Sequence, residues 1–241
     1  MALSPLGNLP LSIEPYNSRT TSYFNTSTIK NYYMIAFTPG YALQASELNE
    51  LQELFYLNES LTQRMYGLWQ DSAFTKLPFW EGLIPLDPTY ITLNSVDYNT
   101  TTNIITVNLS VSDGWYLWTD SESKLSFWIN NPTSFTSSLE VDATQEEYIG
   151  LLIDKEITYC CPSEPCPEGS DSTLRDNSQG NTENWSITCG AARLSAIINS
   201  DLGPVVRDAI ASNFYPILKV SINSTGSPIV SFYDGQIIDQ T

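Results

Sequence analysis

The sequence predicts an α+β protein, mainly β, in which an extended N-terminal arm and one long amphipathic helix precede an antiparallel β-sandwich or small barrel with a cysteine-containing loop. Helical periodicity is sustained only between Ser46 and Trp69. From Leu77 onward, short β-branched and aromatic segments alternate with turn residues. No helical pattern separates these segments, so a parallel sheet is not expected.

Residues 1–36 are expected to form the extended arm. They contain three prolines, isolated aromatic residues and many small polar residues, with neither a helical nor a strand period. One strand is predicted at NYYMIAF, residues 31–37. Such an arm is expected to lie on the body of its own chain or on a neighbour.

Residues 37–75 combine a turn at Pro39 and Gly40 with the predicted helix. Ser46 is the expected N-cap, and Glu47 and Glu50 suit the positive first turn. Spacings of three and four residues, typical of the seam between two helices, connect Leu51, Leu54, Asn58, Leu61, Met65 and Leu68.

Two interpretations of this helix remain open. In the first, it packs on its own β-domain, with Leu48, Leu51 and Phe55 in the buried stripe. In the second, it forms a seam with another chain, and Asn58 at an a position sets the register. The candidate interface residues are Phe37, Pro39, Gly40, Gln44, Glu47, Leu48, Leu51, Leu54, Asn58, Leu61, Met65 and Leu68.

Residues 76–159 are predicted to form the antiparallel β-domain, with about five to seven strands. IITVNLSV, residues 104–111, alternates so that Ile105, Val107, Leu109 and Val111 share one face. Turns are expected at DG, residues 113–114, and at NNP, residues 130–132. Trp115, Trp118 and Trp128 are expected to form core and rim rather than a platform for a ligand.

Residues 160–190 form the predicted cysteine-rich polar loop, and residues 191–241 are expected to hold a short helix and a C-terminal hairpin. The loop is rich in Pro, Ser, Gly, Asn and Asp, which disfavour regular structure. The short helix is predicted around Pro204 to Asn213. The hairpin joins ILKVSI and PIVSFYDGQII through NSTGS, with Pro228 suited to a strand start.

The four cysteines of the chain lie within thirty residues, which leaves three states open. These cysteines are Cys160, Cys161, Cys166 and Cys189. Four thiolates can hold zinc tetrahedrally, although the spacing lacks a C-x-x-C pair. One or two disulfides, or buried free thiols, are the alternatives. No other metal or cofactor is expected.

Composition excludes several classes of function. The chain has no histidine, which excludes Ser-His-Asp and Cys-His nucleophile systems and common His-ligated metal sites. Neither a nucleophile elbow nor a phosphate-binding glycine loop occurs, so no enzyme activity is expected. A net charge of −17, with singly scattered Lys and Arg, offers no basic stripe for nucleic acid or anionic membrane. No apolar run approaches the roughly 18 residues of a membrane span.

The segment FTPGYALQASELNELQELF, residues 37–55, resembles a motif in virion proteins of contractile-tailed phages, particularly those of marine cyanobacteria. The match is carried by Phe37, Pro39, Gly40, Leu43, Gln44, Glu47, Leu48, Asn49 and Gln52. A looser resemblance to the same proteins covers LIDKEITYCCPSEPCPEGSDSTLRDNSQG and CGAARL. The resemblance implies a baseplate-wedge or tail-associated structural protein.

Such a protein is made in the host cytoplasm, resides in the virion and works through contacts with other tail or baseplate proteins, as a homo-oligomer or hetero-oligomer. The alternative expectation is a receptor-binding or fibre-attachment module that recognises host-surface glycan through Trp, Tyr and Asn side chains. Burial of the three tryptophans in the strand core would count against this alternative.

Overall fold

The computed structural model describes residues 32–37, 45–70, 83–120, 123–160, 170–171, 191–206 and 210–232. The predicted arm up to residue 31 and nearly all of the predicted cysteine loop lie outside these ranges. The first described elements are β1 (Tyr32–Phe37), α1 (Ala45–Gln70), β2 (Leu83–Pro85), the 3-10 turn η2 (Pro88–Tyr90), β3 (Ile91–Asn99), β4 (Ile104–Val111) and β5 (Gly114–Thr119). They are followed by β6 (Ser126–Asn131), β7 (Phe135–Asp142), β8 (Glu147–Cys160), β9 (Ser170–Asp171), β10 (Ala191–Val206), β11 (Phe214–Ile222) and β12 (Pro228–Phe232).

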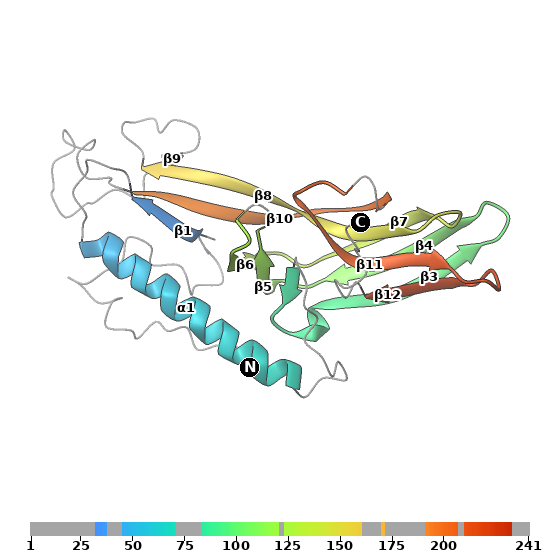
Figure 1. Cartoon of the computed structure of the whole chain (residues 1–241), viewed down its shortest axis with the longest axis horizontal. Coiled ribbons are helices and arrows are strands. Elements are labelled where there is room, and N and C mark those ends of the chain that lie inside the picture. Colours follow the sequence, from blue (N-terminus) through green and yellow to red (C-terminus); the bar gives the residue numbers. More distant parts are fainter. Residues whose placement is uncertain are drawn as a thin grey trace. The chain divides into compact units, whose positions relative to one another are not determined.

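The predicted fold class is confirmed, because the described chain is mainly β with one long helix (Figure 1). The strands form one sheet in the order β1-β10-β8-β11-β12, with β9 beside β8, and two sheets in the orders β2-β5-β6 and β3-β4-β7. The pairings of β1 with β10, of β11 with β8 and β12, of β5 with β2 and β6, and of β4 with β3 and β7 are antiparallel, whereas β8 and β9 are parallel. Among the described residues, no helix is both long and apolar enough to span a membrane.

The chain divides into two compact units. One contains Met1–Ser60 and Lys155–Ile197, and the other contains Leu61–Asp154 and Ile198–Thr241. Helix α1 and strands β8 and β10 contribute residues to both units. The predicted β-domain and the predicted C-terminal hairpin meet in the second unit, where β8 pairs with β11 and β11 pairs with β12.

Strand β4 has the bounds and the inward face that the sequence predicts. Ile105, Val107, Leu109 and Val111 are all fully buried. The strand lies between β3 and β7, so both of its edges are hydrogen-bonded. Strand β7 was missed by the sequence analysis because hydroxyl residues separate its apolar ones and weaken its alternation.

The outward face of the β3-β4-β7 sheet carries a network of amide and hydroxyl side chains. The Asn94 amide donates to the Ser110 hydroxyl at 2.7 Å, and that hydroxyl lies 3.0 Å from the hydroxyl of Thr136. The Asn108 amide donates to Ser95 at 2.7 Å. Cross-strand contacts of this kind explain how a chain with few charges forms an ordered polar surface.

The predicted Asp113-Gly114 turn lies where the chain passes from one sheet to another. Gly114 has a φ of +133° and starts β5, and a Cβ there would lie 2.6 Å from the Tyr90 ring. Close approach and backbone angle therefore both require glycine. Nearby, the Tyr116 hydroxyl donates to the Ser112 carbonyl at 2.8 Å, and burial raises the pKa of this phenol.

Several sequence predictions near the C-terminal half are corrected by the structure. The short helix around Pro204–Asn213 is wrong, because residues 191–206 form strand β10 and residues 210–213 are not helical. Strand β1 pairs only with residues 191–195 of β10. Pro204 lies beyond this paired part, so its missing amide hydrogen removes no hydrogen bond between β10 and β1. Residues 147–160 form one long strand, β8. The predicted hairpin is confirmed as β11 and β12, and β12 begins at Pro228.

The turn between β7 and β8 gives a prediction about pKa. The Asp142 carboxylate accepts hydrogen bonds from the Thr144 amide at 2.8 Å and from its hydroxyl at 2.7 Å, and these bonds lower the pKa of Asp142. A lowered folded-state pKa stabilises the fold above the unfolded pKa, and this contribution is lost as pH falls through the folded value. Thr144→Val should raise the Asp142 pKa in an NMR titration. An unchanged pKa would show that the hydroxyl contributes nothing.

Candidate interaction surface on helix α1

Helix α1 matches the predicted helix to within one residue at each end. It begins at Ala45, so the expected N-cap Ser46 lies inside its first turn. Its buried face is not the one expected, because Glu47, Glu50 and Glu53 are buried there. Three carboxyl side chains, each three residues after the last, therefore lie on the buried face of the N-terminal half of the helix.

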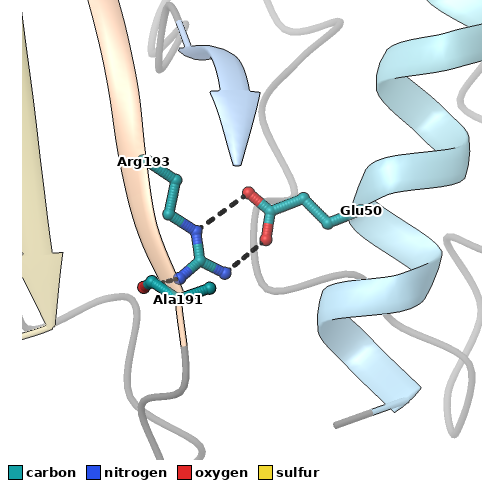
Figure 2. Close-up of polar contacts among 3 residues, drawn as sticks. All are labelled: Glu50, Ala191 and Arg193. Carbon is teal, nitrogen blue, oxygen red and sulfur yellow. Dashed lines mark hydrogen bonds and ion pairs between the residues drawn. The ribbon is translucent and has the colours of Figure 1, made fainter. Parts of the chain in front are cut away.

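Glu50 forms a two-pronged ion pair with Arg193 of β10 (Figure 2). Arg193 Nη2 donates to Glu50 Oε2 at 2.6 Å, and Arg193 Nε donates to Glu50 Oε1 at 3.3 Å. Arg193 Nη1 donates to the Ala191 carbonyl at 2.8 Å. Both charged side chains have no exposed surface. The planar guanidinium matches the two carboxylate oxygens, so the pair holds one rotational setting of α1 against β10.

Apolar contacts continue the same face of the helix. Leu54 packs with Tyr32, Ile35 and Ala191 in one buried cluster. Leu57, Leu61 and Met65 extend the buried line along α1. In the second unit, the Trp128 indole donates to the Thr62 hydroxyl at 3.0 Å, which attaches the C-terminal half of the helix to β6.

The opposite face of α1 leaves large apolar side chains in solvent. Leu48 is 43 % exposed, Leu51 42 %, Phe55 65 % and Tyr56 48 %. The Phe55 and Tyr56 rings meet edge to face at 5.8 Å. Spacings of three, four and eight residues place these side chains on one face of the helix. We name Leu48, Leu51, Phe55 and Tyr56 the outer stripe.

This arrangement corrects the expectation for a core helix, in which Leu48, Leu51 and Phe55 would be buried. It also corrects the predicted seam, because Leu54, Leu61 and Met65 are buried within the chain itself. The physical reason is that β1 and β10 cover the face marked by Glu50 and Leu54. Among the described residues in the N-terminal half of α1, the exposed apolar side chains are therefore those of the outer stripe.

The remaining candidate interface residues have varied positions. Glu47 is buried, Phe37 is 37 % exposed at the end of β1, and Leu68 is partly buried. The Asn58 amide donates to the Leu54 carbonyl of its own helix at 2.8 Å, so in this structure it satisfies the local backbone. The residues of the Pro-Gly joint, Pro39 and Gly40, and also Gln44, lie outside the described ranges.

The cysteine predictions fall almost entirely outside the described residues. Only the backbone of Cys160 is described, at the end of β8 and opposite Asp171. Cys161, Cys166 and Cys189 lie outside the described ranges, so zinc, disulfides and free thiols stay open. Within the described ranges, no group of His, Cys, Asp and Glu side chains is placed to hold a metal ion.

The tryptophans expected in the core and rim are placed as expected. Trp118 is 1 % exposed and Trp128 is 3 % exposed, whereas Trp115 is partly buried. Trp118 packs against Tyr215 with the ring centroids 6.3 Å apart. Trp118 and Trp128 are therefore not available as a flat surface for sugar rings.

Sequence reasoning missed Tyr56 of the outer stripe and the Glu50–Arg193 pair. Arg193 carries a weak signal, since it is the one charged residue in the run AARLSAII, where the other residues are apolar except Ser195. Its partner lies 143 positions earlier in the chain, which no local pattern reveals.

Three comparisons with known proteins found no match. No family model matches the chain, and no curated protein and no solved structure is significantly similar to it. A function is therefore inferred from the residues and geometry of the chain itself.

Proposed function

We propose that this chain is a structural subunit of a phage tail baseplate, in a wedge or peripheral tail position, and that it acts through protein–protein contacts. The observation that supports this proposal most directly is the outer stripe of α1. The resemblance of residues 37–55 to tail-associated virion proteins also supports it, and that segment includes Leu48, Leu51 and Phe55 of the outer stripe.

The outer stripe has the chemistry of an interaction surface. Aromatic residues are enriched in the buried cores of protein interfaces, and charged residues are depleted there. Phe55 and Tyr56 supply two such rings, and Leu48 and Leu51 supply aliphatic surface beside them. Burying apolar surface contributes about 25 cal/mol per Å², so a partner that covers the stripe gains affinity directly.

The inner face of α1 makes the stripe a rigid surface rather than a mobile one. The Glu50–Arg193 pair and the Leu54 cluster attach the first half of the helix to β1 and β10. A side chain on a fixed helix loses less conformational entropy on binding than one on a loose segment. The buried pair therefore favours binding indirectly, by positioning the stripe.

The glycan-recognition alternative receives less support. It depends in part on exposed tryptophan faces, and Trp118 and Trp128 are buried in the strand core. Structural contact through α1 is the function that the described residues favour.

Phe55→Asp is expected to reduce incorporation of the chain into purified tail particles by roughly 30-fold, since a central interface aromatic contributes about 2 kcal/mol or more. Its thermal stability should change little, because Phe55 is 65 % exposed. Incorporation is measured by quantitative mass spectrometry of purified particles. Leu125→Asp is the matched control, because Leu125 is also apolar and is 53 % exposed outside α1.

Two outcomes would contradict the proposal. Wild-type incorporation of Phe55→Asp would exclude the outer stripe as the contact. Absence of the unmodified chain from purified particles would exclude a structural role in the tail altogether.

A further inference from the structure

The first half of helix α1 carries its acidic and apolar residues the opposite way round from an ordinary amphipathic helix. Such a helix packs its apolar stripe on the core and keeps its charges in water. Here the buried side chains include the carboxylates of Glu47, Glu50 and Glu53. The exposed side chains are the apolar ones of the outer stripe, with Phe55 at 65 %. Places where a local sequence rule fails in this way are typically functional or strained.

A rotation of this half of the helix by one residue would reverse the arrangement. One residue corresponds to about 100° of rotation about the helix axis. Each side chain would then take the place of the one before it, and leucines would replace all three carboxylates: Leu48 for Glu47, Leu51 for Glu50 and Leu54 for Glu53. Phe55 would take the place of Leu54, which is only 4 % exposed. Tyr56 would take the exposed place of Phe55 and would stay in solvent.

The Glu50–Arg193 pair is the printed contact of this half-helix that opposes the rotation (Figure 2). Burial of apolar surface and hydration of carboxylates both favour the rotated setting. The rotation would turn Glu50 about 100° away from Arg193 and break both hydrogen bonds between them. Separating two buried charges that pair with each other is costly. The pair therefore selects the observed setting against the local sequence pattern.

The second half of the helix favours the observed setting, so the two halves are out of phase by one residue. The same step there would replace buried Leu61 by Thr62 and buried Met65 by Tyr66. The hydrogen bond from Trp128 to Thr62 also fixes this half. The rotation is thus confined to the first half, and a more tightly wound, 3-10-like turn where the halves meet absorbs the offset.

The junction between the halves contains a side chain suited to such a turn. The Asn58 amide donates to the Leu54 carbonyl at 2.8 Å. An amide side chain that bonds to a helix carbonyl four residues earlier offers the backbone an alternative to its own ladder. The Leu54 carbonyl can therefore keep a donor when the winding of the helix changes around it.

We propose that the Glu50–Arg193 pair is a latch that holds the outer stripe in solvent, and that the first half of α1 has a second, closed setting. In the closed setting Leu48, Leu51 and Phe55 pack on β1 and β10 of the same chain, which covers the surface that a partner would use. The strands already supply an apolar site there, because Tyr32, Ile35 and Ala191 pack with Leu54. All of these residues belong to the first compact unit.

The variant Arg193→Met tests the latch, because it removes the cation and leaves the Glu50 carboxylate on the buried face. The cost of burying that charge then favours the closed setting. Hydroxyl-radical oxidation of Phe55 in the full chain, measured by mass spectrometry, should fall roughly fivefold as the ring becomes buried. Oxidation of Tyr56 should stay within about twofold, because that ring remains exposed in both settings.

The double variant Glu50→Leu with Arg193→Met is the matched control. It has no buried charge to expel, and leucine at position 50 favours the observed setting, so oxidation of Phe55 should return to the rate of the unmodified chain. Unchanged oxidation of Phe55 in Arg193→Met would overturn the proposal. A joint rise at Phe55 and Leu54, or a loss of far-ultraviolet circular dichroism, would overturn it too, since either means unfolding rather than a second packed setting.

This inference rests on the proposed function only in taking the outer stripe as the contact surface. The oxidation experiment uses the chain alone, whereas the tail function is tested on purified particles. Normal incorporation of Phe55→Asp would therefore remove the proposed function and leave the latch in place. Unchanged oxidation of Phe55 in Arg193→Met would remove the latch and leave the proposed function in place.

Discussion

Replacing Glu50 with glutamine is expected to lower the free energy of unfolding by about 3–5 kcal/mol. Glu50 and Arg193 have no exposed surface, and two hydrogen bonds connect their charged groups. Glutamine keeps the size of the side chain but removes its charge, so the buried Arg193 guanidinium would lose the carboxylate that pairs with it through two hydrogen bonds. A loss of this size is a large part of the roughly 5–15 kcal/mol that stabilises a typical domain.

Urea unfolding at constant pH measures this loss. Glu59→Gln is the matched control, because Glu59 is an exposed carboxylate on the same helix and its removal should change stability by less than about 1 kcal/mol. The double variant Glu50→Leu with Arg193→Met should recover most of the stability, since apolar residues can replace a buried ion pair. A loss below about 1 kcal/mol in Glu50→Gln would mean that the pair does not hold α1 in place.

Gly150→Ala is expected to destabilise the second unit by about 3 kcal/mol, near the upper end of the cost of overpacking. Gly150 lies in β8 opposite Pro216, where β11 has a bulge. A Cβ on Gly150 would clash with the Tyr215 carbonyl oxygen and would lie 2.8 Å from the Pro216 Cα. Both contacts are with backbone held in the β8–β11 ladder, so no side-chain rotation can relieve them.

Gly67→Ala provides a control with the opposite expected sign. Gly67 lies in α1, and a Cβ there would meet nothing within 4 Å. Alanine in a helix should therefore raise stability by about 0.5–1 kcal/mol. Thermal unfolding of the two variants compares these effects directly. Equal midpoints for Gly150→Ala and the unmodified chain would show that the β8–β11 contact can widen without cost.

The outer stripe shows how far helical periodicity can predict an interaction site. The spacing of Leu51, Leu54 and Asn58 predicts a helix correctly, since helix formation depends on neighbours in sequence. The same spacing selects the wrong face, because an apolar residue at every third or fourth position marks more than one stripe. Exposed Leu51 and buried Leu54 are adjacent in that pattern and differ only in whether a strand covers them.

Local sequence patterns predict three elements of this protein correctly: a helix over residues 46–69, observed as Ala45–Gln70, the inward face of β4, and the hairpin whose second strand begins at Pro228. Each depends on side-chain period or turn residues within a few positions of the chain. The tertiary structure alone decided that Glu50 faces Arg193, because pairing of buried charges depends on which segments meet across 143 positions. By placing that pair inside, it also decided that Phe55 remains outside, on the surface proposed to meet a partner.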